Sequence, residues 1–264
     1  MFGDFRKYIT IWKILTVNSF IISLTTRFNA VLFLTGKALR FVFFLIFLVT
    51  VLSGSGSFGG YGTQQALFFY LTFTLIDTVT QLFYREVYRF RPMIVSGDFD
   101  LVLAKPMNPL FRSLVGGADP LDLIMLVPYV FLTFAVMPRL GSLTAINVFS
   151  YLTLLLNGFL IATGFHILVL ALAILTTEID HAIMIYRDVT SMGRLPVDIY
   201  REPLRGLITF IIPVGLMMTI PAKAFMGLVT LPALSFFVIL GIGFFTVCVF
   251  FWRYALTKYT SASS

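Results

Sequence analysis

Residues 145–176 read AINVFSYLTLLLNGFLIATGFHILVLALAILT, and this stretch decides the fold. It contains no Asp, Glu, Lys or Arg over 32 residues. A helix that crosses a bilayer needs about 20 mostly apolar residues, so this one is longer than a crossing requires. The stretch therefore predicts a membrane-spanning helix that projects beyond the bilayer.

The rest of the chain has the same character. Of its 264 residues, 59% are hydrophobic and only 12% are charged, whereas a soluble domain carries about 25% charge. The apolar runs are continuous rather than alternating, which predicts helices and not a β-barrel. The net charge of +7 is explained by membrane orientation and anionic lipid, without nucleic acid. The single cysteine, Cys248, excludes an internal disulfide framework.

We predict an all-α integral membrane protein whose residues 1–264 form one transmembrane domain with six spans. The predicted spans are Lys37–Ser53, Gln65–Tyr84, Pro120–Met137, Ala145–Thr176, Gly206–Ile220 and Pro232–Trp252. With these spans, all of the 19 Lys and Arg residues except Arg139 and Lys223 fall on one side. Because cytoplasmic loops carry excess Lys and Arg, we expect a multi-pass protein of the cytoplasmic (inner) membrane with both termini inside. Residues 85–119 and 178–205 would be the two cytoplasmic segments.

The N-terminal region, residues 1–35, has a different pattern. Residues 5–15 place apolar side chains on one helical face and basic ones on the other, which is typical of a helix in the headgroup plane. The apolar face comprises Phe5, Tyr8, Ile9, Trp12 and Leu15. The alternative is a simple extension of the first span. Residues 14–35 contain Asn18, Arg27 and Asn29, which favours a helix that re-enters the interface without crossing.

The segment 85–119 is too long for a simple connector, since most connections have about 4–6 residues. Pro92 can open one short helix, Asp98 can cap a second, and Asn108 with Pro109 begins a third. Such helices could dock a soluble partner, or they could only seal the ends of spans two and three. The residues leave both interpretations open.

Two blocks of sequence resemble a known family. Gly97-Asp98-Phe99-Asp100-Leu101-Val102-Leu103-Ala104-Lys105-Pro106, followed by Asn108-Pro109-Leu110-Phe111, resembles the cytoplasmic loop of permease subunits in type-2 ABC transporters. The second block comprises Arg194, Pro196, Tyr200, Arg205, Pro213, Pro221-Ala222 and Gly227. Both blocks keep the family's spacing relative to the spans and together cover about the last two-thirds of the chain. The closest group is one of six-span permeases that are encoded apart from their ATPase.

The resemblance implies an N-terminal interfacial elbow helix and a cytoplasmic coupling helix that inserts into a separate ATPase. The implied coupling contacts are Asp98, Phe99, Asp100, Leu101, Leu103 and Lys105, with Phe99 and Leu103 as apolar plugs. A second, weaker contact would be formed by Arg194, Pro196 and Tyr200. The resemblance also implies a dimer with a second copy or a homologous permease.

ATP chemistry has to come from another polypeptide. A phosphate loop needs G-x-x-x-x-G-K-[ST], whereas here Gly36-Lys37 is followed by Ala38. We therefore expect no catalytic residue, cofactor or metal on this chain, with ATP and Mg bound by an ABC ATP-binding subunit. The neighbouring Glu178, Asp180 and His181 are interpreted as solvated charge rather than as a metal site.

Candidate residues of the transport pathway lie within the spans. Asp77 is the single acid well inside a span, which marks it as a candidate for substrate or ion contact, with a helix–helix hydrogen bond as the alternative. Asn157, Phe225 and Met226 are weaker candidates, and His166 is expected to be a packed histidine bonded across helices. Pro213 and Pro221 bracket a broken fifth span, and residues 206–231 are expected to include an outer re-entrant segment.

The expected function is that of the permease of an ABC exporter that moves a hydrophobic or amphipathic compound. The Phe-rich spans and the scarcity of buried charge favour such a cargo over small ions. The alternative is a self-contained secondary transporter or channel that uses Asp77.

Overall fold

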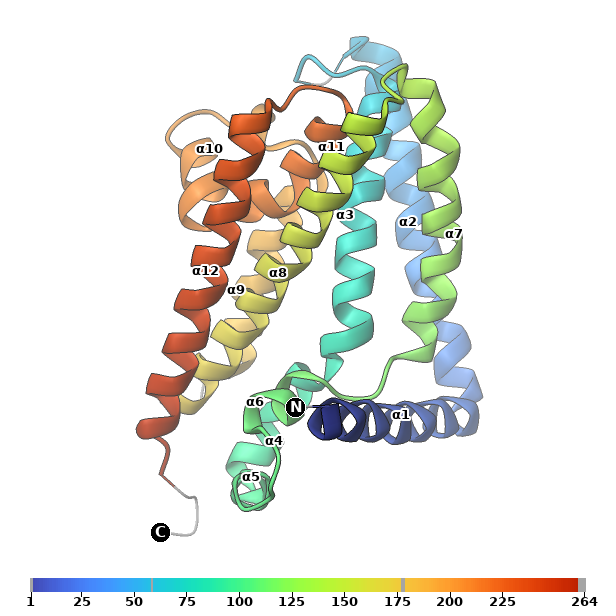
Figure 1. Ribbon diagram of the computed structural model, residues 1–264. Helices are drawn as coiled ribbons and strands as arrows, with labels where there is room; N and C mark the ends of the chain where they lie inside the picture. Colours follow the sequence, from blue (N-terminus) through green and yellow to red (C-terminus); the bar gives the residue numbers. More distant parts are fainter. Residues whose placement is uncertain (1, 58, 177–178, 261–264) are drawn as a thin grey trace.

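The computed structural model describes residues 2–57, 59–176 and 179–260, and all regular structure within these ranges is helical (Figure 1). The helices are α1 (Phe2–Thr25), α2 (Arg27–Ser55), α3 (Thr63–Tyr84), α4 (Phe90–Val95), α5 (Asp98–Leu103), α6 (Pro109–Leu114), α7 (Pro120–Val136), α8 (Ala145–Thr176), α9 (Ile179–Ser191), α10 (Leu204–Gly206), α11 (Ile220–Phe225) and α12 (Leu231–Thr257). Short 3-10 turns lie at Arg85–Arg89, Met137–Leu140, Met192–Arg194 and Val197–Ile199, and π-helical turns lie at Leu207–Ile211 and Gly215–Thr219.

The core of the bundle is formed around α3 and α8, which bury at least half of their residues. Phe225 of α11 packs against Phe68 of α3 and Tyr151 of α8, with ring centroids 5.0 Å and 5.8 Å apart. Helix α8 also runs along α12, where the Asn157 amide donates to the Phe237 carbonyl at 3.0 Å. A side chain at Gly241 would come within 2.1 Å of the Asn157 oxygen, so a glycine there allows this close helix contact.

Five of the six predicted spans correspond to long helices: α2, α3, α7, α8 and α12. All five are long and apolar enough to cross a membrane. Helix α8 begins at Ala145 as predicted and is helical up to Thr176, the last described residue before 177–178, because an uncharged run of this length has no competing structure. Helix α2 begins at Arg27 rather than at Lys37, since the apolar pattern continues N-terminal to Lys37.

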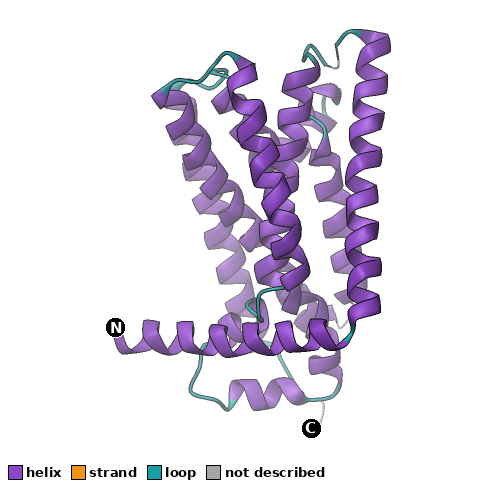
Figure 2. Cartoon of the chain, turned by 90° about the vertical axis from the view of Figure 1, so that its right-hand side faces the viewer, coloured by secondary structure: helices purple, strands orange, loops and turns teal. Residues whose placement is uncertain are grey.

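Helix α1 lies across the end of the bundle, roughly perpendicular to the long helices (Figure 1, Figure 2). Tyr8 packs edge-on against Phe111 with ring centroids 4.6 Å apart, and its hydroxyl accepts from the Asn108 backbone N–H at 3.0 Å. The Ala118 N–H donates to the Thr16 hydroxyl at 3.1 Å. By composition α1 is a sixth candidate span, but its contacts hold it along the loop that joins α5 to α7.

The expected re-entrant element over residues 14–35 is not a separate element. Those residues are divided between the end of α1 and the start of α2, and Thr26 lies at the break with a non-helical backbone conformation. The polar residues that suggested re-entry fall on both sides of this break. The sequence pattern could not locate it, because Thr26 carries no proline or glycine signal.

The fifth span differs from the prediction. Helix α9 packs along α8, and the chain after it reaches the turn between α2 and α3, where the Tyr61 hydroxyl donates to Asp198 at 2.9 Å. Ile199 lies against Gly59 of the same turn. The segments Leu204–Ile211 and Gly215–Phe225 then form a bent pair with an angle of 76° between them. Pro213 lies in the break of this pair.

Residues 197–205 therefore lie at the opposite end of the bundle from α5, and the prediction that 178–205 forms one segment on the α5 side is wrong. Arg201 and Arg205 lie at the same end as Lys223. Assigning every Arg of this segment to the α5 side failed because an acid at the opposite end pairs with cations there. This acid is Asp198, which pairs with Arg205 at 3.1 Å and with Lys223 at 2.6 Å. Pro221 does not interrupt the segment Gly215–Phe225; it lies where the π-helical turn Gly215–Thr219 passes into α11.

A second ion-pair network joins α2, α7 and the turn after α3. Asp122 of α7 is fully buried and pairs with Lys37 of α2 and with Arg85 at 3.2 Å. Arg85 also pairs with Asp119, whose side chain caps α7 by accepting from the Leu121 N–H at 2.8 Å. Lys37, the first residue of the first predicted span, turns toward this carboxylate.

We predict that Asp122→Asn lowers the free energy of unfolding by about 3–5 kcal/mol, because it leaves the Lys37 ammonium without its buried partner. The measurement is thermal or denaturant unfolding in detergent micelles. The paired replacement Lys37→Met with Asp122→Leu should recover most of the loss, since Arg85 keeps Asp119. An Asp122→Asn protein as stable as the wild type would contradict this role.

We also predict that Asp198→Asn destabilises the chain by about 1–3 kcal/mol. Burial acts to raise the pKa of Asp198, but Lys223, Tyr61 and Arg205 outweigh it and hold the pKa below its usual 3.8. A carboxyl with a lowered folded pKa stabilises above its unfolded pKa, and that stabilisation is lost as pH falls below 3.8 toward the lowered value. The difference in melting temperature between wild type and variant should therefore shrink in that range. Asp188→Asn, at an exposed carboxyl, is the control and should have little effect.

Candidate functional site

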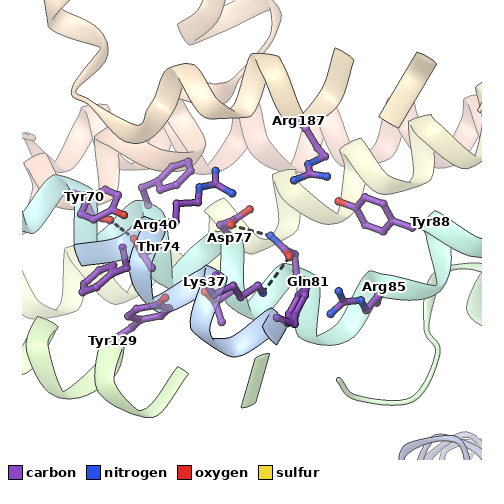
Figure 3. A pocket seen from close by; sticks show the side chains of 15 residues that line it. Lys37, Arg40, Tyr70, Thr74, Asp77, Gln81, Arg85, Tyr88, Tyr129 and Arg187 are labelled. Carbon is purple, nitrogen blue, oxygen red and sulfur yellow. Dashed lines mark hydrogen bonds between the residues drawn. The ribbon is translucent and has the colours of Figure 1, made fainter. Parts of the chain in front are cut away.

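A cavity of about 440 Å³ opens between α2, α3, α7 and α9. It extends from Tyr70 on α3 to Tyr88 in the turn after that helix, and Figure 3 shows the labelled side chains around it. Its lining mixes aromatic and charged residues: Phe33, Gly36, Lys37, Arg40, Phe41, Tyr70, Phe73, Thr74, Asp77, Thr78, Gln81, Arg85, Tyr88, Tyr129 and Arg187. A concave site with apolar walls and a few charged groups is the usual form of a ligand site.

Asp77 occupies the centre of this lining. The Gln81 amide, one helical turn later on α3, donates to the Asp77 carboxylate at 2.9 Å. Lys37 donates to the Gln81 oxygen at 3.4 Å and lies 4.8 Å from the centre of the Phe33 ring. The hydrogen bond lies within α3 and orients the carboxylate, so it is not the helix–helix hydrogen bond that the alternative predicted. The position of Asp77 in the cavity keeps ligand contact open.

Two arginines approach Asp77 from different helices. Arg40 comes from α2 and Arg187 from α9, and both side chains are directed at the space beside Asp77 (Figure 3). Both are exposed, and neither forms an ion pair within the described ranges. Sequence reasoning missed them, because Arg187 was assigned to a cytoplasmic segment and Arg40 to the end of a span.

A second cavity of about 440 Å³ adjoins the first. The two share six lining residues, namely Arg40, Phe73, Asp77, Gln81, Tyr88 and Arg187. The second adds Asp188 and Arg194, and the Arg194 guanidinium lies 5.9 Å from the centre of the Phe73 ring. The two cavities therefore form one charged region along α3 and α9.

The other predicted pathway residues lie elsewhere. Asn157 holds α8 to α12, as described above, and Phe225 is completely buried in the core. Met226 follows Phe225 at the end of α11 and packs against the same core. None of the three lines either cavity around Asp77. His166 is buried between the rings of Tyr84 and Tyr186, so it is packed as expected. Its Nδ1 lies 2.8 Å from the Ala162 carbonyl of the same helix, so the expected bond across helices is not the one found for this nitrogen.

The predicted coupling segment forms helix α5 at the end of the bundle, beyond α1 (Figure 1). Gly97 precedes α5 with a φ of +79°, a left-handed conformation that favours glycine. Leu101 is 62% exposed and Leu103 is 38% exposed, and Lys105 is exposed beside them. The two exposed leucines make this surface apolar at its centre.

Phe99 cannot be an apolar plug for a partner, because its side chain is completely buried. Its ring lies 5.1 Å from Phe90, 6.4 Å from Trp252 and 5.1 Å from Tyr259. Phe99 thus attaches α5 to α4 and to the end of α12. The sequence could not show this, since Trp252 and Tyr259 lie far away along the chain.

The two acids of α5 have partners within the chain. Asp98 accepts from the Ser96 hydroxyl at 2.7 Å, and Asp100 accepts from the Tyr259 hydroxyl at 2.9 Å. Burial and the hydrogen bond to Asp100 raise the pKa of Tyr259 to about 12. Tyr259 therefore stays a donor at neutral pH and helps to hold α5 against the C-terminal end of α12.

Arg194, Pro196 and Tyr200 do not join this surface. Tyr200 donates from its hydroxyl to the Met192 carbonyl at 3.1 Å, and the Val197 N–H beside Pro196 donates to Thr219 of the bent pair at 3.2 Å. Arg194 lines the second cavity. These three residues support the re-entrant pair and the cavity, so the prediction that they contact the same ATPase as α5 is wrong.

No group of three potential metal ligands occurs among the residues that the structure describes. Glu178, one of the three residues weighed as a metal site, lies outside the described residues.

The comparisons with known proteins agree with this architecture. The family model of the ABC-2 family transporter protein matches residues 37–263, which is most of the chain. No curated protein and no solved structure matches it. The chain is a multi-pass membrane protein, because it matches this family and has several helices that are long and apolar enough to cross a membrane. The chain belongs to the ABC-2 transporter family and is a permease of an ABC transporter.

Proposed function

We propose that this chain is the permease subunit of an ATP-driven exporter and that a separate ATP-binding subunit docks on α5. The observation that carries the proposal is the exposed pair Leu101 and Leu103 on a short helix held rigidly at the end of the bundle. An unpaired apolar surface of this kind, surrounded by polar residues, is typical of an interface with another protein.

The ATP chemistry belongs to that partner. The chain carries no phosphate-binding loop, so ATP and Mg would be held by the partner subunit, and the permease would act as a binding and conformational unit. ABC-2 permeases are membrane components of their transporters, which agrees with this division.

The end of the bundle that carries α5 would face the cytoplasm of the inner membrane. Basic residues gather there on several elements: Arg6, Lys7, Lys13, Arg85, Arg89, Arg91, Lys105, Arg112, Arg253 and Lys258. This bias is the one that positions cytoplasmic loops. Both termini belong to this end by the same argument.

A second permease, either a copy of this chain or a homologue, would complete the pathway. Arg40 and Arg187 are exposed at a depth where lipid would be a poor solvent for charge. A dimer that placed the two charged cavities toward each other would line a shared pathway and remove these groups from lipid.

We predict that Leu101→Asp with Leu103→Asp prevents docking of the ATP-binding subunit. Two buried charges in an apolar contact would weaken binding by about 30-fold or more. The measurements are co-purification of the two subunits and stimulation of ATP hydrolysis. The melting temperature should not change, because both leucines are exposed in the isolated chain.

Leu143→Asp is the matched control for this prediction. Leu143 is 58% exposed in the turn before α8, at the far end of the bundle, so its variant should bind the ATP-binding subunit normally. Unchanged binding by the Leu101→Asp, Leu103→Asp variant would exclude α5 as the docking surface. Phe99→Asp is not an informative substitution here, because it would disrupt the core around Trp252.

The alternative function is a self-contained secondary transporter, and the position of Asp77 in the cavity favours it. The two functions differ in their energy source. We expect transport in proteoliposomes to require ATP and the partner subunit, and to continue in wild type and in Asp77→Asn when the proton gradient is collapsed. Transport that follows the gradient without ATP, and that Asp77→Asn abolishes, would establish the alternative.

A further inference from the structure

We propose that the charged region beside Asp77 binds an anionic head group attached to an apolar body, with Arg40 and Arg187 as the anion's ligands. The proposal rests on the proposed function and adds the chemical class of the cargo to it. The sequence favoured a hydrophobic or amphipathic compound from the Phe-rich spans and the scarcity of buried charge, whereas the cavity specifies the charge of the polar end.

The first argument is the charge of the lining. Five cations line the two adjoining cavities, namely Lys37, Arg40, Arg85, Arg187 and Arg194, against two acids, Asp77 and Asp188. Lys37 and Arg85 are occupied by Asp122 and Asp119, which leaves three guanidinium groups for two carboxylates. A cationic cargo would be repelled by this excess of positive charge, and a neutral cargo would leave the positive charge without a counter-charge.

The second argument is geometric. Arg40 and Arg187 come from α2 and α9 and are directed at the same space (Figure 3). Neither has an ion-pair partner in the part of the chain that the structure describes. Guanidinium groups have several donors in a planar fork, which matches the oxygens of a carboxylate, sulfate or phosphate. An anion placed between them would receive hydrogen bonds from two helices at once.

The third argument concerns the walls. Aromatic rings from three helices surround the charged groups, and they belong to Phe33, Phe41, Tyr70, Phe73 and Tyr129. Each cavity has a volume of about 440 Å³, within the range of about 300–1,000 Å³ typical of small-molecule sites. The site therefore offers an apolar surface next to the cations, which suits a molecule with a hydrocarbon or ring body. A small inorganic anion would leave this surface unused.

The test measures equilibrium binding of labelled oleate to the full chain in phosphatidylcholine nanodiscs, with empty nanodiscs subtracted. We expect saturable binding that weakens by about tenfold for each arginine removed in Arg40→Gln and Arg187→Gln. Oleyl alcohol, which has the same body without the charge, should bind weakly and equally to all variants. Arg139→Gln removes one exposed charge at the far end and should bind oleate as the wild type does.

Two further arms address folding and the source of the anion. Arg40→Lys and Arg187→Lys keep the charge and should retain more oleate binding than the Gln variants, which a purely structural role would not produce. Replacing part of the phosphatidylcholine by phosphatidylglycerol should weaken oleate binding to the wild type if lipid head groups occupy the site. If oleate binding stays the same, the ligand is a solute with its own apolar body.

The proposal is overturned if oleate and oleyl alcohol bind the wild type equally, or if the Gln variants bind oleate as tightly as the wild type does. The binding measurement needs no ATP-binding subunit, so its result does not depend on whether the proposed function is correct. If the chain binds oleate but no ATP-binding subunit docks on α5, the proposed function fails and the anion site stands. If the ATP-binding subunit docks normally on α5 but the chain does not bind oleate, the anion site fails and the proposed function stands.

Discussion

A charge at membrane depth needs an opposite charge, a polar partner or water, and this constraint organises the structure. Asp122 satisfies it for Lys37 and Arg85, and in doing so it joins α2, α7 and the turn after α3 at one buried carboxylate. These three elements line the cavity together with α3 and α9. The position of the cavity therefore depends on the ion pairs of Asp122, although Asp122 itself does not line the cavity.

The same constraint acts at the other end of the bundle. Asp198 collects Tyr61, Arg205 and Lys223, and it thereby fixes the start of the bent pair to the turn between α2 and α3. The pair enters and leaves the bundle at that end, and its second segment, Gly215–Phe225, packs against α8 and α3. Broken helices survive at membrane depth only where protein or water satisfies their backbone, and α3 and α8 provide the protein here.

The long uncharged helices could be predicted from the sequence, because nothing but a span accommodates a run such as residues 145–176. Helix α9 could not be predicted from the sequence, because Arg187 and Asp188 interrupt its apolar pattern. The segment was therefore assigned to a cytoplasmic loop. Asp77 was recognised as a site residue because it is isolated, whereas Arg40 and Arg187 were hidden among basic residues assigned to the inner surface. The sequence also could not show that Phe99 is buried against Trp252, because that contact joins distant parts of the chain.

The cavity and the α5 surface are connected by a short, rigid path. Tyr88 lines the cavity from the turn Arg85–Arg89, and that turn leads directly into α4. Phe90 of α4 is packed against Phe99 of α5 at 5.1 Å, and both rings are buried. Because close-packed rings cannot be compressed, a displacement of α5 has to move α4 and the turn that carries Tyr88. On the proposed function, force applied by an ATP-binding subunit would therefore reach the cavity without passing through the bilayer-facing helices.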